Sequence, residues 1–234
     1  MLMKILCVSC LLIFSICVFG QVETSKPAAK SGEKEVKKAN QRPAEPPKKA
    51  EPFDKVDVKT MASKCVVFNT EKGKIEMEMF PESAPESVRN FLNLVATKAL
   101  DTTTFSRVVT DFVIQGGDLY TSQKLTNDLK WRAIRTIPDE PNLIKHERGI
   151  LSMARSDEPN SASTSFFILV TKAETLDDKF AAFGRVIKGM DIVDTINKMT
   201  VENEKPKEPV RITSAVINTC DSKEEELKTE DKIN

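Results

Sequence analysis

Short runs of apolar or alternating residues recur from Cys65 to about residue 219 and predict β-strands. The first two runs, 65–68 and 74–79, are separated by Glu71-Lys72-Gly73 and predict a hairpin. The second run alternates polar and apolar residues, as a strand with one solvated face does. The other predicted strands are 105–109, 113–116, 150–154, 165–170, 181–187 and 210–219.

Helical spacing of apolar residues is confined to two segments. Pro85 suits the first turn of a helix, and the apolar residues that follow predict a helix over about 85–97 with one apolar stripe. A second helix is predicted near 189–198, with Val193 and Ile196 facing inward. Many short strands with few helices favour an antiparallel barrel or sandwich over a parallel α/β sheet.

One predicted hairpin carries an arginine and a glutamine in otherwise apolar strands. If Thr110-Asp111-Phe112 form a three-residue loop, Val109 faces Val113, and Arg107 lies directly opposite Gln115 on the same face of the sheet. This segment alone leaves two interpretations open. The two side chains form a functional pair of donors, or the hairpin belongs to the core and Arg107 pairs with a carboxylate.

The two ends of the chain differ in composition from its middle. Lys4, the apolar run 5–19 and Val18-Phe19-Gly20 predict a secretory signal peptide over 1–20, and therefore export to a periplasm or extracellular space. An uncleaved membrane anchor formed by 5–19 is the alternative, although the run is short for a spanning helix. Residues 21–60 are rich in Lys, Glu, Ala and Pro and predict a disordered linker, which leaves one domain over 61–221 and a charged tail over 222–234.

Two cysteines remain after the predicted signal peptide. Cys65 lies at the start of the first strand-like run and Cys220 at the end of the last one. In an oxidising compartment this pair can form a disulfide that joins the two ends of the domain, and two buried free thiols are the alternative.

Composition and motifs exclude several classes of function. The 35 basic and 35 acidic residues cancel, so no overall field favours nucleic acid. The chain has a single histidine, His146, which we interpret as structural, and it has no G-x-S-x-G elbow and no cluster of metal ligands. The segment Gln115-Gly116-Gly117-Asp118 lacks the Lys-Ser/Thr of a phosphate loop. We therefore expect no cofactor, no metal and no nucleic-acid partner.

An ordered set of motifs resembles the cyclophilins, which are peptidyl-prolyl cis-trans isomerases. The motifs are Phe105-x-Arg107, Phe112-x-x-Gln115-Gly116-Gly117-Asp118, Gly149-x-Leu151-Ser152-Met153-Ala154, Pro159-Asn160-Ser161, Ser165-Phe166-Phe167-Ile168 and Phe183-Gly184-x-Val186. The resemblance covers about residues 62–220. It implies a mainly β fold, an eight-stranded closed antiparallel barrel capped by two α-helices, with a peptide groove on its outer face.

The resemblance also implies a role for each matching residue. Arg107 would direct its guanidinium at the prolyl nitrogen, and Gln115 would hydrogen-bond the substrate backbone near the rotating bond. The proline ring would be held by an apolar pocket, and the substrate residues before proline would be lined by Ala154 and the backbone of Arg155. The expected pocket residues are Phe112, Val113, Phe167, Leu176 and Phe180.

Four positions depart from the family pattern. Ser106 replaces a frequent histidine, Ser165 a usual glutamine, Thr175 a tryptophan at the groove rim, and Phe180 a pocket histidine.

The first hypothesis is a monomeric peptidyl-prolyl isomerase that acts on X-Pro bonds of unfolded or extended exported polypeptides and assists their folding. The alternative, favoured by Ser165 and Thr175, is a weakly active or inactive module that binds proline peptides or serves as a scaffold. The indole at position 175 is the group that cyclosporin uses in sensitive members, so weak cyclosporin binding is expected.

Overall fold

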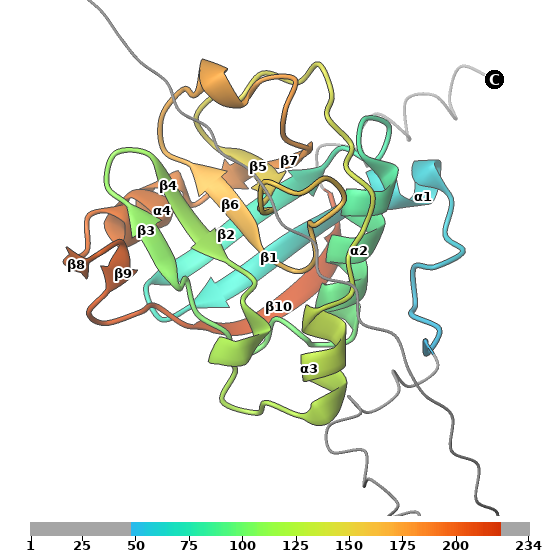
Figure 1. The fold of residues 1–234 in the computed structure, drawn as a ribbon, viewed down its shortest axis with the longest axis horizontal. Helices are drawn as coiled ribbons and strands as arrows, with labels where there is room; N and C mark the ends of the chain where they lie inside the picture. Colours follow the sequence, from blue (N-terminus) through green and yellow to red (C-terminus); the bar gives the residue numbers. More distant parts are fainter. Residues whose placement is uncertain (1–47, 221–234) are drawn as a thin grey trace, which may run out of the picture. The chain divides into compact units, whose positions relative to one another are not determined.

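The computed structural model describes residues 48–220, and its centre is one eight-stranded antiparallel sheet (Figure 1). The sheet order is β10-β1-β2-β7-β5-β6-β4-β3. Every strand predicted from the sequence is present, with ends within two residues of the expected ones. The strands are β1 (Lys64–Thr70), β2 (Gly73–Met79), β3 (Arg107–Val109), β4 (Val113–Gly116), β5 (Ile150–Met153), β6 (Phe166–Leu169), β7 (Ala182–Lys188) and β10 (Ile212–Thr219).

The expected closed barrel is an overstatement, because the sheet curls into a half-barrel. Its two edge strands are β3 and β10, and a single bridge, Thr104 to Arg211, joins the segments that precede them. Strand β3 has only three residues, and the main-chain N–H of Val108 at its centre donates to Glu204 at 2.8 Å rather than to β10. A short edge strand with another partner cannot complete the ladder.

Both predicted helices are confirmed, as α2 (Pro85–Ala96) and α4 (Met190–Asn197). Phe91 of α2 packs against the sheet face that forms the main core, with ring centroids 5.1 Å from Phe183 and 5.3 Å from Phe166. Val193 and Ile196 of α4 are fully buried, as expected. The apolar stripe of each helix therefore packs against the main core on the concave side of the curled sheet.

Several short elements were not predicted. They are α1 (Val58–Ala62), the 3₁₀ turns η1 (Leu119–Thr121) and η2 (Glu174–Leu176), α3 (Asn127–Ala133), and a two-stranded hairpin of β8 (Val201–Glu202) and β9 (Lys205–Pro206). Helix α3 begins after Thr126, whose hydroxyl accepts from the Leu129 N–H at 3.2 Å. Elements this short carry too few periodic positions to be predicted from hydrophobicity.

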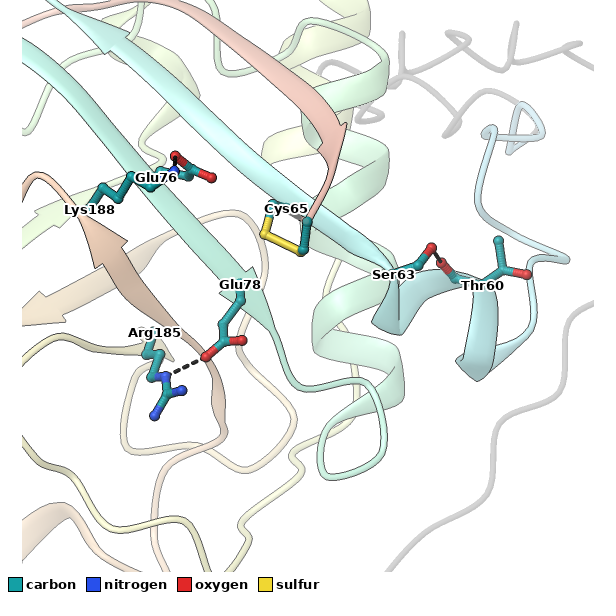
Figure 2. Close-up of a disulfide and its surroundings, with 8 residues drawn as sticks. Thr60, Ser63, Cys65, Glu76, Glu78, Arg185 and Lys188 are labelled. Carbon is teal, nitrogen blue, oxygen red and sulfur yellow. Dashed lines mark hydrogen bonds and ion pairs between the residues drawn. A yellow bond between two sulfur atoms is a disulfide. The ribbon is translucent and has the colours of Figure 1, made fainter. Parts of the chain in front are cut away.

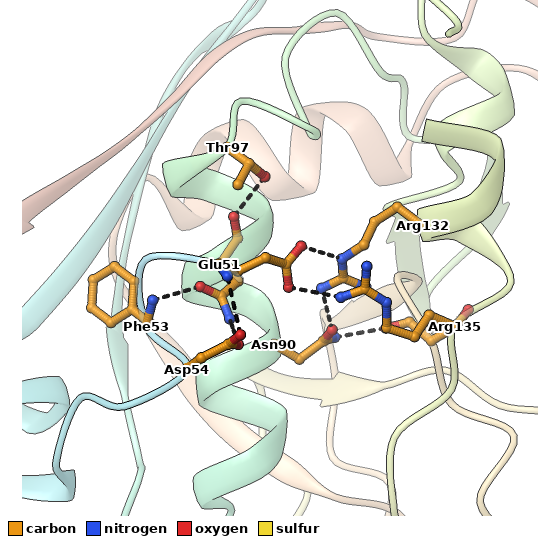
Figure 3. Close-up of polar contacts among 9 residues, drawn as sticks. Glu51, Phe53, Asp54, Asn90, Thr97, Arg132 and Arg135 are labelled. Atoms are coloured by element: carbon orange, nitrogen blue, oxygen red, sulfur yellow. Dashed lines mark hydrogen bonds and ion pairs between the residues drawn. The ribbon is translucent and has the colours of Figure 1, made fainter. Parts of the chain in front are cut away.

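The predicted linker is wrong for its last residues, because the ordered domain begins before residue 61. The Glu51 carboxylate accepts from Arg132 Nε at 2.8 Å and from Arg135 Nη1 at 3.1 Å, and the Phe53 N–H donates to Asn93 at 2.7 Å (Figure 3). We call residues 51–62 the N-terminal strap. Prolines and charges made this segment resemble a linker, whereas ion pairs with distant residues order it. The predicted signal peptide, the linker up to residue 47 and the predicted tail over 222–234 lie outside the described residues.

Cys65 and Cys220 form a disulfide, which confirms the first of the two alternatives for this pair (Figure 2). Cys65 lies in β1 and Cys220 directly follows β10, so the bond joins the first and last strands of the sheet in chain order, which are neighbours within it. Both residues are fully buried. Within residues 48–220, no helix is long and apolar enough to span a membrane.

Candidate active site

Four strands bring a row of side chains together on one face of the sheet. Arg107 of β3 lies opposite Gln115 of β4, Gln115 opposite Phe167 of β6, and Phe167 opposite Ser152 of β5. The register of the predicted hairpin is thus confirmed, including the pair Val109 and Val113. Side chains directly opposite each other point to the same face, so the row lies on one face of the sheet, with Ser152 fully buried at its end.

Arg107 and Gln115 are in direct contact. Arg107 Nη1 donates to Gln115 Oε1 at 3.1 Å. The Arg107 side chain keeps 43% of its exposure, so it is accessible from solvent. Of the core alternative for this hairpin, the pairing of Arg107 with a carboxylate is confirmed, since its Nε lies 2.7 Å from Glu204, whereas burial of the arginine is wrong, because the guanidinium reaches the surface.

The apolar residues expected to contact substrate gather beside this row, on the sheet face opposite the main core. Phe166 and Ile168 of β6 point into the core, so alternation directs Phe167 and Leu169 to the other face. All six predicted apolar contact residues belong to this second hydrophobic cluster, which we call the outer cluster. They are Val113 and Phe167, which are buried, and Phe112, Ala154, Leu176 and Phe180, which are partly buried.

The Arg155 side chain also contacts the outer cluster, although the resemblance pointed only to its backbone. The guanidinium lies over the Phe180 ring, 5.0 Å from the centroid, and Phe180 in turn contacts Phe167 edge-on with centroids 5.9 Å apart. Arg155 Nη2 also donates to the carbonyl of Lys179 at 3.3 Å. A cation over the face of a ring restrains the ring. Arg155 thus forms one wall of the outer cluster.

His146 lies beneath this surface in a buried hydrogen-bond chain. Its Nδ1 is 3.1 Å from Asp177 Oδ1 and its Nε2 is 2.9 Å from Ser152 Oγ. Burial lowers the pKa of His146, which keeps the imidazole neutral near pH 7. Although serine, histidine and aspartate also form hydrolase triads, Ser152 is fully buried and cannot reach a substrate. This hydrogen-bond chain holds Ser152 of β5, which lies beside Phe167 of β6 in the sheet.

Glu204 is the site residue that the sequence did not reveal. It lies in the turn between β8 and β9, and its carboxylate accepts from Arg107 Nε at 2.7 Å. The contact joins residues 97 positions apart, so no local pattern pointed to it. In residues 48–220, no group of three or more His, Cys, Asp or Glu side chains is arranged to hold a metal ion.

Comparison with known proteins gives a consistent result. The family model described as cyclophilin type peptidyl-prolyl cis-trans isomerase/CLD matches residues 65–217. A peptidyl-prolyl cis-trans isomerase of Acinetobacter baylyi is 34% identical over 71% of this chain and 92% of its own length. Another, from Dictyostelium discoideum, is 36% identical over 68% of this chain and its full length.

Solved structures agree with these relatives. A crystal structure of a cyclophilin type peptidyl-prolyl cis-trans isomerase from Cryptosporidium parvum superimposes with a TM-score of 0.60 at 29% identity, covering 67% of this chain and 98% of that one. The matched segment contains the row from Arg107 to Ser152 and the whole outer cluster. On its fold, its motifs and these relatives, the chain belongs to the cyclophilin-type peptidyl-prolyl cis-trans isomerases.

Proposed function

We propose that this isomerase acts on X-Pro bonds of exported polypeptides and assists their folding, with Arg107 as the catalytic residue. The observation that carries the proposal is an accessible guanidinium placed beside an apolar cluster on one sheet face. A proline residue offers the matching pair of features, an amide nitrogen next to an apolar ring.

The chemistry requires no nucleophile. Delocalisation of the nitrogen lone pair into the carbonyl creates a rotational barrier of about 18–20 kcal/mol. A cation that hydrogen-bonds the prolyl nitrogen localises this lone pair, and it does so best when the amide is twisted. Arg107 then stabilises the transition state more than either planar ground state, which lowers the barrier.

Gln115 supplies the second polar contact. Its Oε1 accepts from Arg107, and its Nε2 hydrogens have no partner among the described residues. These hydrogens are free to donate to a carbonyl of the substrate backbone. One side of the rotating bond would then stay fixed while the other turns.

The outer cluster would hold the proline ring. Phe112, Val113, Phe167, Leu176 and Phe180 provide an apolar surface within the same cluster, and Ala154 and Arg155 continue it along the chain direction of β5. The Cryptosporidium parvum relative was also crystallised in the presence of the dipeptide Ala-Pro, which supports a proline-containing ligand for this surface.

Export is supported by two independent features. The leader over 1–20 has the composition of a signal peptide. The Cys65–Cys220 disulfide is a feature typical of proteins that mature in an oxidising compartment. Newly exported chains with non-native X-Pro isomers are then the substrates within reach.

The test is a proline-peptide isomerisation assay on the wild type and Arg107→Ala. We expect the wild type to exceed the uncatalysed rate and Arg107→Ala to lose about 100-fold in kcat/KM. Arg148→Ala is a matched control, because Arg148 is an equally exposed arginine that pairs with a carboxylate, Asp194, and it should stay within about twofold.

Each outcome separates the hypotheses. A wild type that binds proline peptides without accelerating their isomerisation would support the binding or scaffold module instead. Equal loss in the Arg107 and Arg148 variants would refute the assignment of Arg107 as the catalytic group.

A further inference from the structure

The turn between β8 and β9 is hydrogen-bonded to two consecutive residues of β3. The Glu204 side chain accepts from Arg107 Nε at 2.7 Å, and the Glu204 main-chain carbonyl accepts from the Val108 N–H at 2.8 Å. The Arg107 side chain is 43% exposed and the Glu204 side chain is 51% exposed. A single residue of the turn therefore contacts both the edge of the sheet and the candidate catalytic group.

The backbone of this turn is unusual for the residues it contains. Asn203 and Glu204 have φ values of 50° and 63°, in the left-handed region, as both central residues of a type I′ hairpin turn do. Glutamate is uncommon there, and such a conformation persists only where surrounding contacts hold it. Here the contacts are the two hydrogen bonds to β3, so the strained turn and the arginine are held together.

The donors of Arg107 are divided between two partners. A guanidinium has five N–H groups in one rigid plane. Nε donates to Glu204 and Nη1 to Gln115, while Nη2 has no partner within residues 48–220. Two contacts at different nitrogens fix both the position and the plane of the group, whereas Gln115 alone would leave it free to rotate.

We propose that Glu204 is a positioning residue for isomerisation, which holds the Arg107 guanidinium so that its free Nη2 edge meets the prolyl amide. This inference rests on the proposed catalytic role of Arg107. A group displaced by a fraction of an ångström loses much of its effect on a transition state. The two ends of the hydrogen-bond chain, Gln115 and Glu204, would thus set the working orientation of the arginine.

The carboxylate has a second effect of opposite sign, since its negative charge weakens the positive potential at the substrate. Glutamine separates the two effects, because its carbonyl oxygen still accepts from Nε but carries no charge. If positioning dominates, Glu204→Ala loses activity and Glu204→Gln keeps it. If charge competition dominates, both variants become faster.

The experiment compares isomerase kcat/KM for the wild type, Glu204→Ala and Glu204→Gln, each also in the Arg107→Ala background. Glu202→Ala is the control, because Glu202 is an exposed acid of the same hairpin facing Lys205. We expect Glu204→Ala to lose about fivefold, and Glu204→Gln and Glu202→Ala to stay within about twofold of the wild type. In the Arg107→Ala background Glu204→Ala should cause no further loss, because Glu204 acts through Arg107.

A readout independent of activity is the ¹H–¹⁵N signal of the Arg107 Nε–H, assigned by its absence in Arg107→Lys. It should broaden through exchange with water in Glu204→Ala and remain in Glu204→Gln.

An active wild type with an equally active or faster Glu204→Ala would overturn the inference and leave the proposed function intact. A further loss of equal size in the Arg107→Ala background would show a purely structural hairpin. A wild type without isomerase activity would overturn both proposals.

Discussion

At the scale of single residues, His146 is a buried group whose charge state the fold affects. It is the only histidine in the chain, and it bridges Asp177 and Ser152 from inside the domain. Burial lowers its pKa below the ordinary 6.5, despite the nearby carboxylate of Asp177. The unfolded chain therefore binds a proton more readily than the folded protein does as the pH falls below about 6.5.

The first prediction is a loss of stability in mildly acidic solution. The contribution of neutral His146 is fully present above pH 6.5 and declines below it, at up to about 1.4 kcal/mol per pH unit. Asp177 does not contribute to the pH dependence in this window. Its pKa is lowered, chiefly by the hydrogen bond from the main-chain N–H of His146, so its contribution to stability is lost only near and below pH 3.8. Urea unfolding at pH 7.5 and 5.5 measures the difference.

His146→Gln is the control for this prediction, since glutamine does not titrate. The wild type should lose more stability than the variant between the two pH values. Equal losses would mean that another group controls the acid sensitivity.

The second prediction concerns Thr175, an exposed residue of η2 beside Leu176 of the outer cluster. Since threonine offers no indole N–H and little apolar area, we expect weak cyclosporin binding, and Thr175→Trp should strengthen it. Calorimetric titration measures the affinity, with Thr195→Trp on the exposed side of α4 as a control. Wild-type affinity equal to that of sensitive cyclophilins would contradict the role given to this position.

At the scale of secondary-structure elements, the N-terminal strap behaves as part of the domain. Glu51 and Arg132 are nearly buried, with side-chain exposures of 11% and 7%. Arg132 also donates to Asn90 of α2 at 2.6 Å, so the strap, α2 and α3 meet at one guanidinium (Figure 3). Breaking one partner of such a pair leaves a buried charge without its counter-ion.

The third prediction follows from this geometry. Glu51→Ala should lower the free energy of unfolding by about 3–5 kcal/mol, measured by urea denaturation. Lys49→Ala is the matched control: Lys49 also forms an ion pair, with Asp128 on α3, but the two side chains are 80% and 72% exposed. That variant should change stability by less than about 1 kcal/mol. Similar effects of the two substitutions would show that the strap is not held by the buried pair.

At the scale of the whole domain, the disulfide links the first strand in the chain, β1, to the end of the last one, β10, which is its neighbour in the sheet. Cys65 and Cys220 are separated by 155 residues, so the bond constrains nearly the entire folded chain. A crosslink over so long a loop restricts the unfolded state strongly. Together with the antiparallel ladder from Lys64 to Thr70, it keeps β10 against β1.

The fourth prediction is that reduction destabilises the domain. Dithiothreitol should lower the free energy of unfolding by about 2–4 kcal/mol, measured by urea denaturation with and without the reductant. The double variant Cys65→Ser with Cys220→Ser should resemble the reduced protein and should not respond to dithiothreitol. A wild type that is unaffected by reduction would show that β1 and β10 pair equally well without the bond.

Alternation and helical spacing were enough to predict the strands, the two main helices and the register of the Arg107–Gln115 hairpin, because both patterns are local consequences of burying one face. The sequence also identified the apolar residues of the outer cluster through the resemblance to cyclophilins. Features that depend on contacts between distant residues could be seen only in the folded protein. The ion pairs of Glu204 with Arg107 and of Glu51 with Arg132 join segments that no local pattern relates. The open edge between β3 and β10 likewise depends on how distant strands are placed. Ion pairs of this kind have no periodicity, so they become visible only once the chain is folded.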